Sequence, residues 1–329
     1  MLDIIIPTYK NKEGLRQTLS SIDRSYLNEI TISIVDDASE IYYNDIFEQF
    51  PFITIYYKYP NSGPGVAREY GIHTTIEPYI MFIDTGDTLI DSKILPTIIN
   101  TIKQNPEIVV FSWQYKIGEK TSTNNNNRLH GRVYKREFLE KYGIEFCATG
   151  SYTNEDVGFN RLCRIIIDDK QLKSMNFKNP IINYIKDENS ITNKNKGEFF
   201  FRQQNKGLAL NSIHTIKIAE KNNVSLSIIL NEVNSIMSSM YYTFLCTAYE
   251  RPEFVQEAWE GARLFYNQCF IPYIEKNSNE KIATAYNLFV KRIYLRAKAH
   301  SWKNFKPLNY TRFLKNLKEY ETVPSWYNA

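Results

Sequence analysis

The chain has 329 residues, of which 43% are hydrophobic and 14% aromatic, and its formal net charge is +4. This length and composition exclude a disordered chain and suffice for about two domains with hydrophobic cores. No apolar run reaches the roughly 18 to 20 residues of a membrane span, and the sequence starts in a strand-like run without a charged leader. We therefore expect a soluble cytoplasmic protein, or one that lies peripherally at the inner membrane face. The four cysteines lack CxxC spacing, which argues against a zinc knot or a disulfide framework.

The first half of the chain alternates short β-rich runs with helical ones. We predict strands at Asp3–Pro7, Ile30–Val35, Phe52–Tyr57, Tyr79–Ile83 and Ile108–Trp113, and helices at Lys12–Arg24, Pro64–Thr75 and Leu89–Gln104. Strands separated by helices of this length predict an α/β fold, Rossmann-like, with a mostly parallel sheet flanked by helices. The segments Lys120–Arg128 and Lys186–Gly197 are typical of polar loops.

Helical windows replace the β signals near residue 200, so we predict one domain over 1–200 and a helical C-terminal domain over 201–329. The second is basic from residue 281, where ten Lys or Arg stand against Glu319 and Glu321. Two readings of this basic segment stay open. It could bind DNA or another anionic polymer through phosphate contacts and aromatic stacking, or it is a solvated helix face whose aromatic side chains pack inward.

The apolar run Ile80–Ile83 ends abruptly in Asp84 and Asp87, which are separated by a small Thr-Gly pair. A buried strand that ends in acids places hard oxygen ligands at the edge of an α/β sheet, where such folds bind their ligands. A metal-bound phosphate would fit there. The alternative is that these acids cap the next helix or tighten a turn.

Three other loops follow predicted strands: Pro7–Tyr9, Asp36–Ser39 and Asn61–Arg68. Parallel topology would bring all these strand ends to one crevice, where an acid can accept a base N–H or a ribose hydroxyl, a tyrosine can stack and an arginine can neutralise a diphosphate. The alternatives are an N-cap for Asp37 or Ser39, a helix start at Pro64 and a surface position for Arg68. Only the occurrence of all these elements in this order favours the functional reading.

These motifs together resemble the family 2 glycosyltransferases of GT-A fold. The resemblance rests on Ile5–Tyr9, Val35–Ser39, Asn61–Gly71, Phe82–Asp87, Leu129–Leu139, Ile144–Phe146 and Asn154–Phe159, and it covers about the first 195 residues. It implies transfer of a sugar, with inversion, from a nucleotide diphosphate donor, favourably a UDP-sugar, to a hydroxyl acceptor. The first domain would bind the donor, and the second would bind the acceptor or mediate oligomerisation.

The resemblance also implies roles for single residues. Asp84 and Asp87 match the family's metal-binding acidic motif, although Gly86 departs from the commoner Asp-x-Asp-Asp form. We expect Asp87 to bind Mn²⁺ or Mg²⁺ directly and Asp84 to contact the ribose or a metal-bound water. Asp156 matches the catalytic base, with Glu155 supporting it or contacting the acceptor. The residues implied in donor binding are Pro7, Tyr9, Asp36 for the base, Asp37, Gly63, Arg68, Asp84 and Lys186.

Elementary chemistry agrees with the proposed base. A hydroxyl is a weak acid, and a carboxylate at the start of a helix can remove its proton as it attacks. The alternative for Glu155 and Asp156 is that they complement the helix dipole. Lys186 could equally belong to a surface turn. His130 precedes Gly131 in a region expected to line the acceptor side, but a lone histidine in a polar loop is more often incidental.

The acceptor is left open by the sequence. We expect a cell-surface glycan or a wall polymer. A phage-type enzyme that glycosylates a modified base in DNA is an alternative, which the basic C-terminal segment would suit. A noncatalytic sugar-nucleotide or nucleic-acid binding module is the alternative from another class, and the acids at 84, 87 and 156 argue against it.

Overall fold

The computed structural model describes residues 1–91, 93–117, 120–124, 128–148, 153–185, 198–275, 292–302 and 309–324. The chain divides into two compact units, Met1–Tyr152 with Phe159–Asn193, and Thr153–Gly158 with Lys194–Ala329. These units interleave in sequence around residues 153–158, and the predicted domain boundary at residue 200 stays a prediction.

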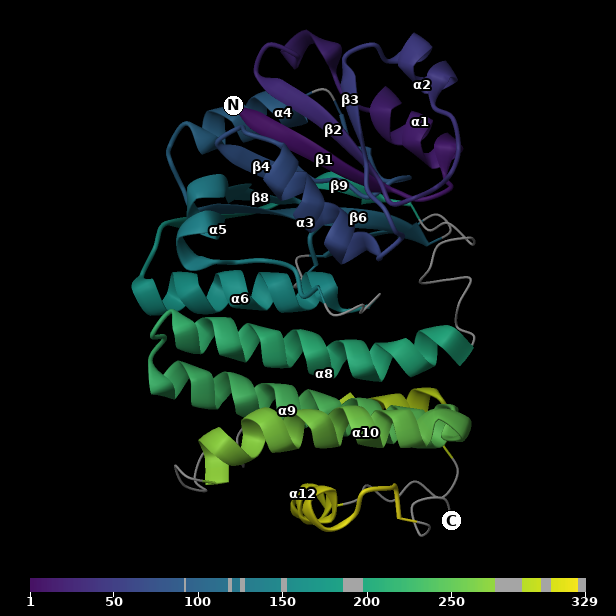
Figure 1. Cartoon of the computed structure of the whole chain (residues 1–329), viewed down its shortest axis with the longest axis vertical. Coiled ribbons are helices and arrows are strands. Elements are labelled where there is room, and N and C mark those ends of the chain that lie inside the picture. The colour runs from purple at the N-terminus through teal and green to yellow at the C-terminus, as the bar shows by residue number, and fades with distance from the viewer. Residues whose placement is uncertain are drawn as a thin grey trace. The chain divides into compact units, whose positions relative to one another are not determined.

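The first unit is built on one sheet, in which the described strands follow the order β3-β2-β1-β4-β8-β6-β9-β5, with β7 paired to β6 (Figure 1). The strands are β1 (Leu2–Thr8), β2 (Ile30–Asp36), β3 (Ile53–Tyr57), β4 (Tyr79–Phe82), β5 (Thr88–Leu89), β6 (Ile108–Ile117), β7 (Lys120–Asn124), β8 (Arg132–Lys135) and β9 (Ser174–Tyr184). Strand β1 is parallel to β2 and β4, β2 to β3, and β6 to β9. Strand β8 runs antiparallel to both β4 and β6.

The helices of this region are α1 (Lys12–Ser20), α2 (Asn44–Gln49), α3 (Pro64–Thr74), α4 (Ile94–Ile102), α5 (Arg136–Tyr142) and α6 (Glu155–Lys170), with a short 3₁₀ helix, η1 (Arg24–Tyr26). Helix α3 begins at Pro64, directly after Gly63 with φ +90°, because proline fits the first helical turn and glycine accepts a positive φ. At Gly71 an added Cβ would lie 2.6 Å from Cγ2 of Ile5. Glycine therefore lets α3 pack closely on β1.

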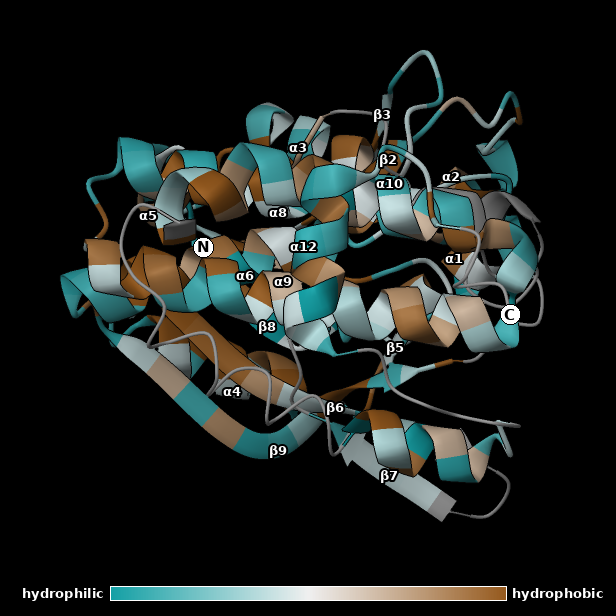
Figure 2. Cartoon of the chain, turned by 90° about the horizontal axis from the view of Figure 1, so that it is seen from below, coloured by the Kyte–Doolittle hydropathy of each residue, from teal (hydrophilic) through white to brown (hydrophobic). Residues whose placement is uncertain are grey.

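The predicted α/β class is confirmed, but the sheet is mixed rather than mostly parallel. Leu89, predicted to start a helix, lies in β5, and α4 begins at Ile94. The predicted loop Lys120–Arg128 contains β7, a polar strand that pairs with β6, and its pale colour contrasts with the alternating hydrophilic and hydrophobic residues of β9 (Figure 2). Its backbone pairing, rather than apolar side chains, makes β7 a strand.

The second unit is helical, as predicted for this part of the chain. It contains α8 (Glu198–Lys221), α9 (Leu226–Glu250), the 3₁₀ helix η2 (Pro252–Phe254), α10 (Val255–Phe265), the π-helical η3 (Tyr266–Glu275), a helix over 292–299 and α12 (Tyr310–Glu319). Helices α8, α9 and α10 pack side by side (Figure 1). None of the described helices is both long and apolar enough to cross a bilayer.

Aromatic side chains form the centre of the helical unit. Phe244, Trp259 and Phe313 are fully buried and in mutual ring contact, with centroids 5.2 to 5.8 Å apart. Tyr310 is also buried and packs on Tyr241 at 5.3 Å. Within the basic segment, the aromatic residues of α12 therefore pack inward, as the second reading of that segment expects.

A buried ion pair joins the start of β1 to the start of α5 in the first unit. Arg136 Nη2 donates to Asp3 Oδ2 over 2.9 Å and to Thr75 Oγ1 over 2.7 Å, and Arg136 Nε donates to the Glu77 carbonyl over 2.8 Å. The Asp3 carboxylate also accepts the Glu77 N–H over 2.8 Å. Breaking such a buried pair on one side leaves an uncompensated charge in the protein interior.

Replacing Arg136 with methionine should lower the free energy of unfolding by about 3–5 kcal/mol, because Asp3 keeps its buried charge and loses its partner. Urea denaturation measures the change. The matched control is Lys141→Met on the exposed face of α5, which should cost less than about 0.5 kcal/mol. Equal losses in the two variants would contradict the role of the pair.

Candidate metal centre and active site

Asp84 and Asp87 lie in the tight turn that joins β4 to β5. The Asp87 N–H donates to the Asp84 carbonyl over 2.9 Å, and Gly86 between them has φ +104°, a conformation that residues with side chains rarely adopt. The Gly86 N–H donates to Thr18 Oγ1 of α1 over 2.9 Å, which holds the turn from outside. Gly86, the departure from the family pattern, is therefore the residue that permits this turn.

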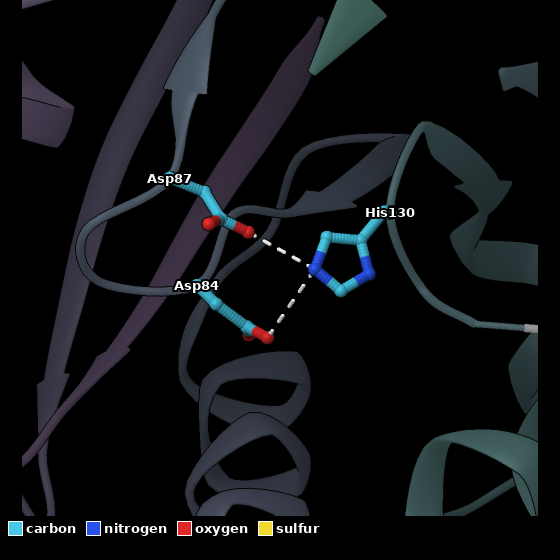
Figure 3. Close-up of side chains that lie close together, drawn as sticks. All are labelled: Asp84, Asp87 and His130. Atoms are coloured by element: carbon cyan, nitrogen blue, oxygen red, sulfur yellow. Dashed lines mark ion pairs between the residues drawn. The ribbon is translucent and has the colours of Figure 1, made fainter. Parts of the chain in front are cut away.

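Both carboxylates point towards one imidazole, that of His130 (Figure 3). His130 Nε2 lies 3.0 Å from Asp87 Oδ2 and 3.9 Å from Asp84 Oδ2. The other oxygen of each acid is held by the protein: Asp84 Oδ1 accepts from Arg68 Nη2 over 2.5 Å, and Asp87 Oδ1 accepts the Ile185 N–H over 3.0 Å. Asp84 Oδ2 and Asp87 Oδ2, the inner oxygens, thus face His130 Nε2. The outer oxygens, Asp84 Oδ1 and Asp87 Oδ1, are bound by Arg68 and the Ile185 N–H, which fix the two carboxylates.

His130 reaches this position because β8 is antiparallel to β4. The residues just before β8 therefore lie beside those just after β4, where Asp84 stands. Gly131 makes the approach to β6 sterically feasible: its φ is +75°, its carbonyl accepts the Phe111 N–H over 2.8 Å, and an added Cβ would lie 2.8 Å from the Phe111 carbonyl oxygen. Sequence reasoning missed His130 as a site residue. The glycine after His130 was the only local feature that pointed to a close approach of this loop to another strand.

Two aromatic rings surround the imidazole of His130. The ring centroid of Trp113 on β6 lies 5.2 Å away, and that of Tyr184 on β9 lies 5.4 Å away, edge to face at 85°. Only 8% of the His130 side chain is exposed. The ring is therefore held by packing on neighbouring strands.

The two acids have opposite pKa shifts. Burial raises the pKa of Asp87, and the neighbouring Asp84 charge adds to this effect while His130 opposes it. Burial also acts to raise the pKa of Asp84, but the Arg68 guanidinium and His130 outweigh it, so the pKa of Asp84 is lowered. In the metal-free protein, the negative charge is thus stabilised at Asp84 and disfavoured at Asp87.

The predicted donor-side acids lie at the carboxyl end of β2, where they hold neighbouring loops. Asp36 accepts the Tyr43 hydroxyl over 2.7 Å and the Ser39 N–H over 3.1 Å. Asp37 accepts the Gly63 N–H over 2.7 Å, at the start of α3. Both acids are buried. Their observed contacts are structural, and contact with a donor base stays a prediction.

The remaining donor-side predictions are placed as follows. The Pro7 carbonyl accepts from Thr85 Oγ1 over 2.7 Å, which ties the end of β1 to the acidic turn. Tyr9 is 46% exposed just after β1, and Lys10 Nζ lies 5.1 Å from the centroid of its ring. Lys186 lies outside the described residues.

Glu155 and Asp156 begin α6 and belong to the helical unit. This helix start is fixed by α8: Asn211 Nδ2 donates to the Thr153 carbonyl over 3.1 Å, and an added Cβ on Gly158 would lie 2.9 Å from the Asn211 Cβ. Glu155 is buried, and Asp156 is partly exposed. The catalytic roles of Asp156 and Glu155, and their approach to the acids of the first unit, stay predictions.

Comparison with known families settles the class of the first unit, in which the acidic turn lies. Residues 3–162 match the model of glycosyl transferase family 2. This part of the chain is a family 2 glycosyltransferase domain. The match covers β1 to the first half of α6, and thus all the predicted site residues except Lys186.

Individual glycosyltransferases are similar to this chain over parts of their length. An uncharacterized glycosyltransferase of Haemophilus influenzae is 30% identical over 111 residues, 33% of this chain and 36% of that protein. A processive diacylglycerol β-glycosyltransferase of Mycoplasma genitalium is 27% identical over 112 residues, 32% of each protein. The matched segment therefore spans about a third of these curated relatives.

Solved structures share the fold over most of the chain. The crystal structure of S. aureus TarS residues 1–349 in complex with UDP-GlcNAc superposes with a TM-score of 0.56 at 14% identity, covering 90% of this chain and 92% of that one. The fold of this family 2 protein is thus the GT-A fold, followed by a helical region.

We predict that the two acids respond oppositely to neutralisation in the metal-free protein. With EDTA at pH 7, Asp87→Asn should raise the melting temperature and Asp84→Asn should lower it. The raised pKa means that charged Asp87 costs stability once the pH exceeds its folded pKa. The lowered pKa means that charged Asp84 contributes stability, which is lost as the pH falls through its folded pKa.

Thermal melts of both variants and the parent protein between pH 4 and 8 measure these effects. The Asp87→Asn advantage should disappear at the acidic end of the range. The opposite order of melting temperatures at pH 7 would show that the assigned charge distribution is wrong.

Proposed function

We propose that this chain is a metal-dependent inverting glycosyltransferase that moves a sugar from a nucleotide diphosphate donor to a hydroxyl acceptor. The observation that carries the proposal is the convergence of the inner oxygens of Asp84 and Asp87 at one point of a family 2 domain. Carboxylates are the ligands that Mn²⁺ and Mg²⁺ prefer. A cation bound there would neutralise charge on the leaving diphosphate.

The residues around the acids would prepare the site for such a cation. Arg68 and the Ile185 N–H fix the outer carboxylate oxygens, so the inner ones need little reorganisation on binding. Arg68 is buried and committed to Asp84, so its first role is to orient that acid. Its cationic charge would also favour a diphosphate nearby.

Proton removal would fall to Asp156. A carboxylate at the start of α6 can accept the proton of the attacking hydroxyl, with Glu155 supporting its position. The hydrogen bond from Asn211 of α8 to the Thr153 carbonyl holds the start of α6 in place. This supports the proposed role of Asp156, because a general base must be held close to the hydroxyl that it deprotonates.

UDP-sugars are the favoured donors. TarS, whose fold is similar, has been crystallised in complex with UDP-GlcNAc and in complex with UDP, which supports a uridine nucleotide here. The sugar itself is left open in this proposal. Among acceptors we favour a cell-surface glycan or wall polymer over DNA, because two of the aromatic residues that DNA stacking would use, Tyr310 and Phe313, are buried.

A thermal-shift screen tests the donor directly. A panel of UDP-, GDP- and dTDP-sugars is added with MnCl₂, with MgCl₂ or with EDTA. We expect stabilisation by UDP-sugars only when a divalent cation is present, because a ligand that binds the folded state stabilises it. Equal stabilisation in EDTA would contradict metal-dependent donor binding.

Changing Asp156 to Asn should lower kcat by about 10²- to 10⁴-fold, because general base catalysis is lost. The affinity for the UDP-sugar with Mn²⁺ should stay unchanged. UDP release measures turnover, and calorimetry measures donor binding. The matched control is Asp168→Asn on the exposed face of the same helix, which should keep full activity. Undiminished turnover in Asp156→Asn would reject the assigned base.

A further inference from the structure

We infer that His130 Nε2 is a third protein ligand of the cation and that it makes the site select Mn²⁺ over Mg²⁺. This inference rests on the proposed metal-dependent function and adds to it the identity of the metal. Nε2 and one oxygen from each acid all lie within 4.8 Å of one another. The two acids lie in the turn between β4 and β5, and His130 is the residue before Gly131.

The spacing of these atoms fits a coordination shell. Neighbouring ligand atoms about 2.1 Å from an octahedral ion stand about 3 Å apart. His130 Nε2 and Asp87 Oδ2 are 3.0 Å apart, and Asp84 Oδ2 is 3.9 Å from Nε2. An ion could therefore contact all three atoms after a small movement of Asp84, whose side chain is 38% exposed and has room to adjust.

The ring of His130 is held in this orientation by the protein. Trp113 and Tyr184 pack against it from two neighbouring strands, and the close contact of Gly131 with β6 fixes the backbone next to it. A histidine that served only as a mobile counter-charge would not need this packing.

The donor set then decides which metal binds best. Mg²⁺ strongly prefers oxygen ligands and keeps several waters, whereas imidazole nitrogen suits transition metals. Two carboxylate oxygens and one imidazole nitrogen therefore favour Mn²⁺ over Mg²⁺. An all-oxygen site made of Asp84 and Asp87 would discriminate much less.

The alternative is that His130 is an imidazolium that neutralises Asp87 in the absence of metal. The two readings predict opposite effects of His130→Asn. If His130 is a ligand, the variant loses Mn²⁺ affinity by about tenfold or more, while its Mg²⁺ affinity changes little. If His130 is only a counter-charge, the variant binds both cations as well as the parent protein or better.

The experiment titrates the full-length, metal-free chain with MnCl₂, alone and with UDP, and follows free Mn²⁺ by electron paramagnetic resonance. Competition with MgCl₂ gives the Mg²⁺ affinity. Pulsed measurements on the bound Mn²⁺ report ¹⁴N coupling from a directly coordinated imidazole. The coupling should be present in the parent protein and in the control His73→Asn, which changes an exposed histidine of α3, and absent in His130→Asn.

The outcomes separate this inference from the proposed function. Bound Mn²⁺ without ¹⁴N coupling, and with the same Mn²⁺ to Mg²⁺ preference in His130→Asn, would overturn the role of His130 and leave the metal-dependent function intact. No binding of either cation, with or without UDP, would overturn both. If His130→Asn does not fold, as judged by circular dichroism, the ¹⁴N coupling of the parent protein decides alone.

Discussion

The site depends on bringing two carboxylates together, one of which, Asp87, is buried. Like charges at short range repel, and the Asp84 charge contributes to the raised pKa of Asp87. The protein compensates with Arg68 on one outer oxygen, a backbone N–H on the other, and His130 facing both inner oxygens. Because Arg68 and the Ile185 N–H bind the outer oxygens, the negative charge on the inner oxygens of Asp84 and Asp87 stays available to a ligand. A cation is the ligand that completes such an arrangement.

The fold provides this arrangement through two glycines and one antiparallel pairing. Gly86 bends the chain so that the acids before and after it share a side, and Gly131 lets the neighbouring loop approach β6. The pairing of β4 with β8 brings the two loops together. Neither glycine has a chemical role of its own. Each is required because a side chain would strain or block the backbone at that point.

The sequence predicted the elements that carry a strong local pattern. Strands β1, β2 and β4, with their buried apolar runs, the β-rich strand β3, and the acids that follow β4 could be located without a structure. Strand β7 could not, because its polar residues resemble a loop and only pairing with β6 makes it a strand. The same limit explains why the sequence did not place His130 beside Asp84. Under a mostly parallel topology its loop has no reason to lie near Asp84, and antiparallel pairing is a long-range property that local periodicity does not encode.

The candidate site residues are divided between the two units of the chain. The sheet carries the acids that would hold the cation, whereas the start of α6, with Asp156, is anchored to α8 of the helical unit. If the proposed roles are correct, donor affinity and proton removal depend on different parts of the fold. Changes in the helical unit that disturb the Asn211 anchor should affect the chemical step more than metal binding. Under the proposed function, the helices after residue 198 would hold Asp156 in place, apart from any contact they make with the acceptor.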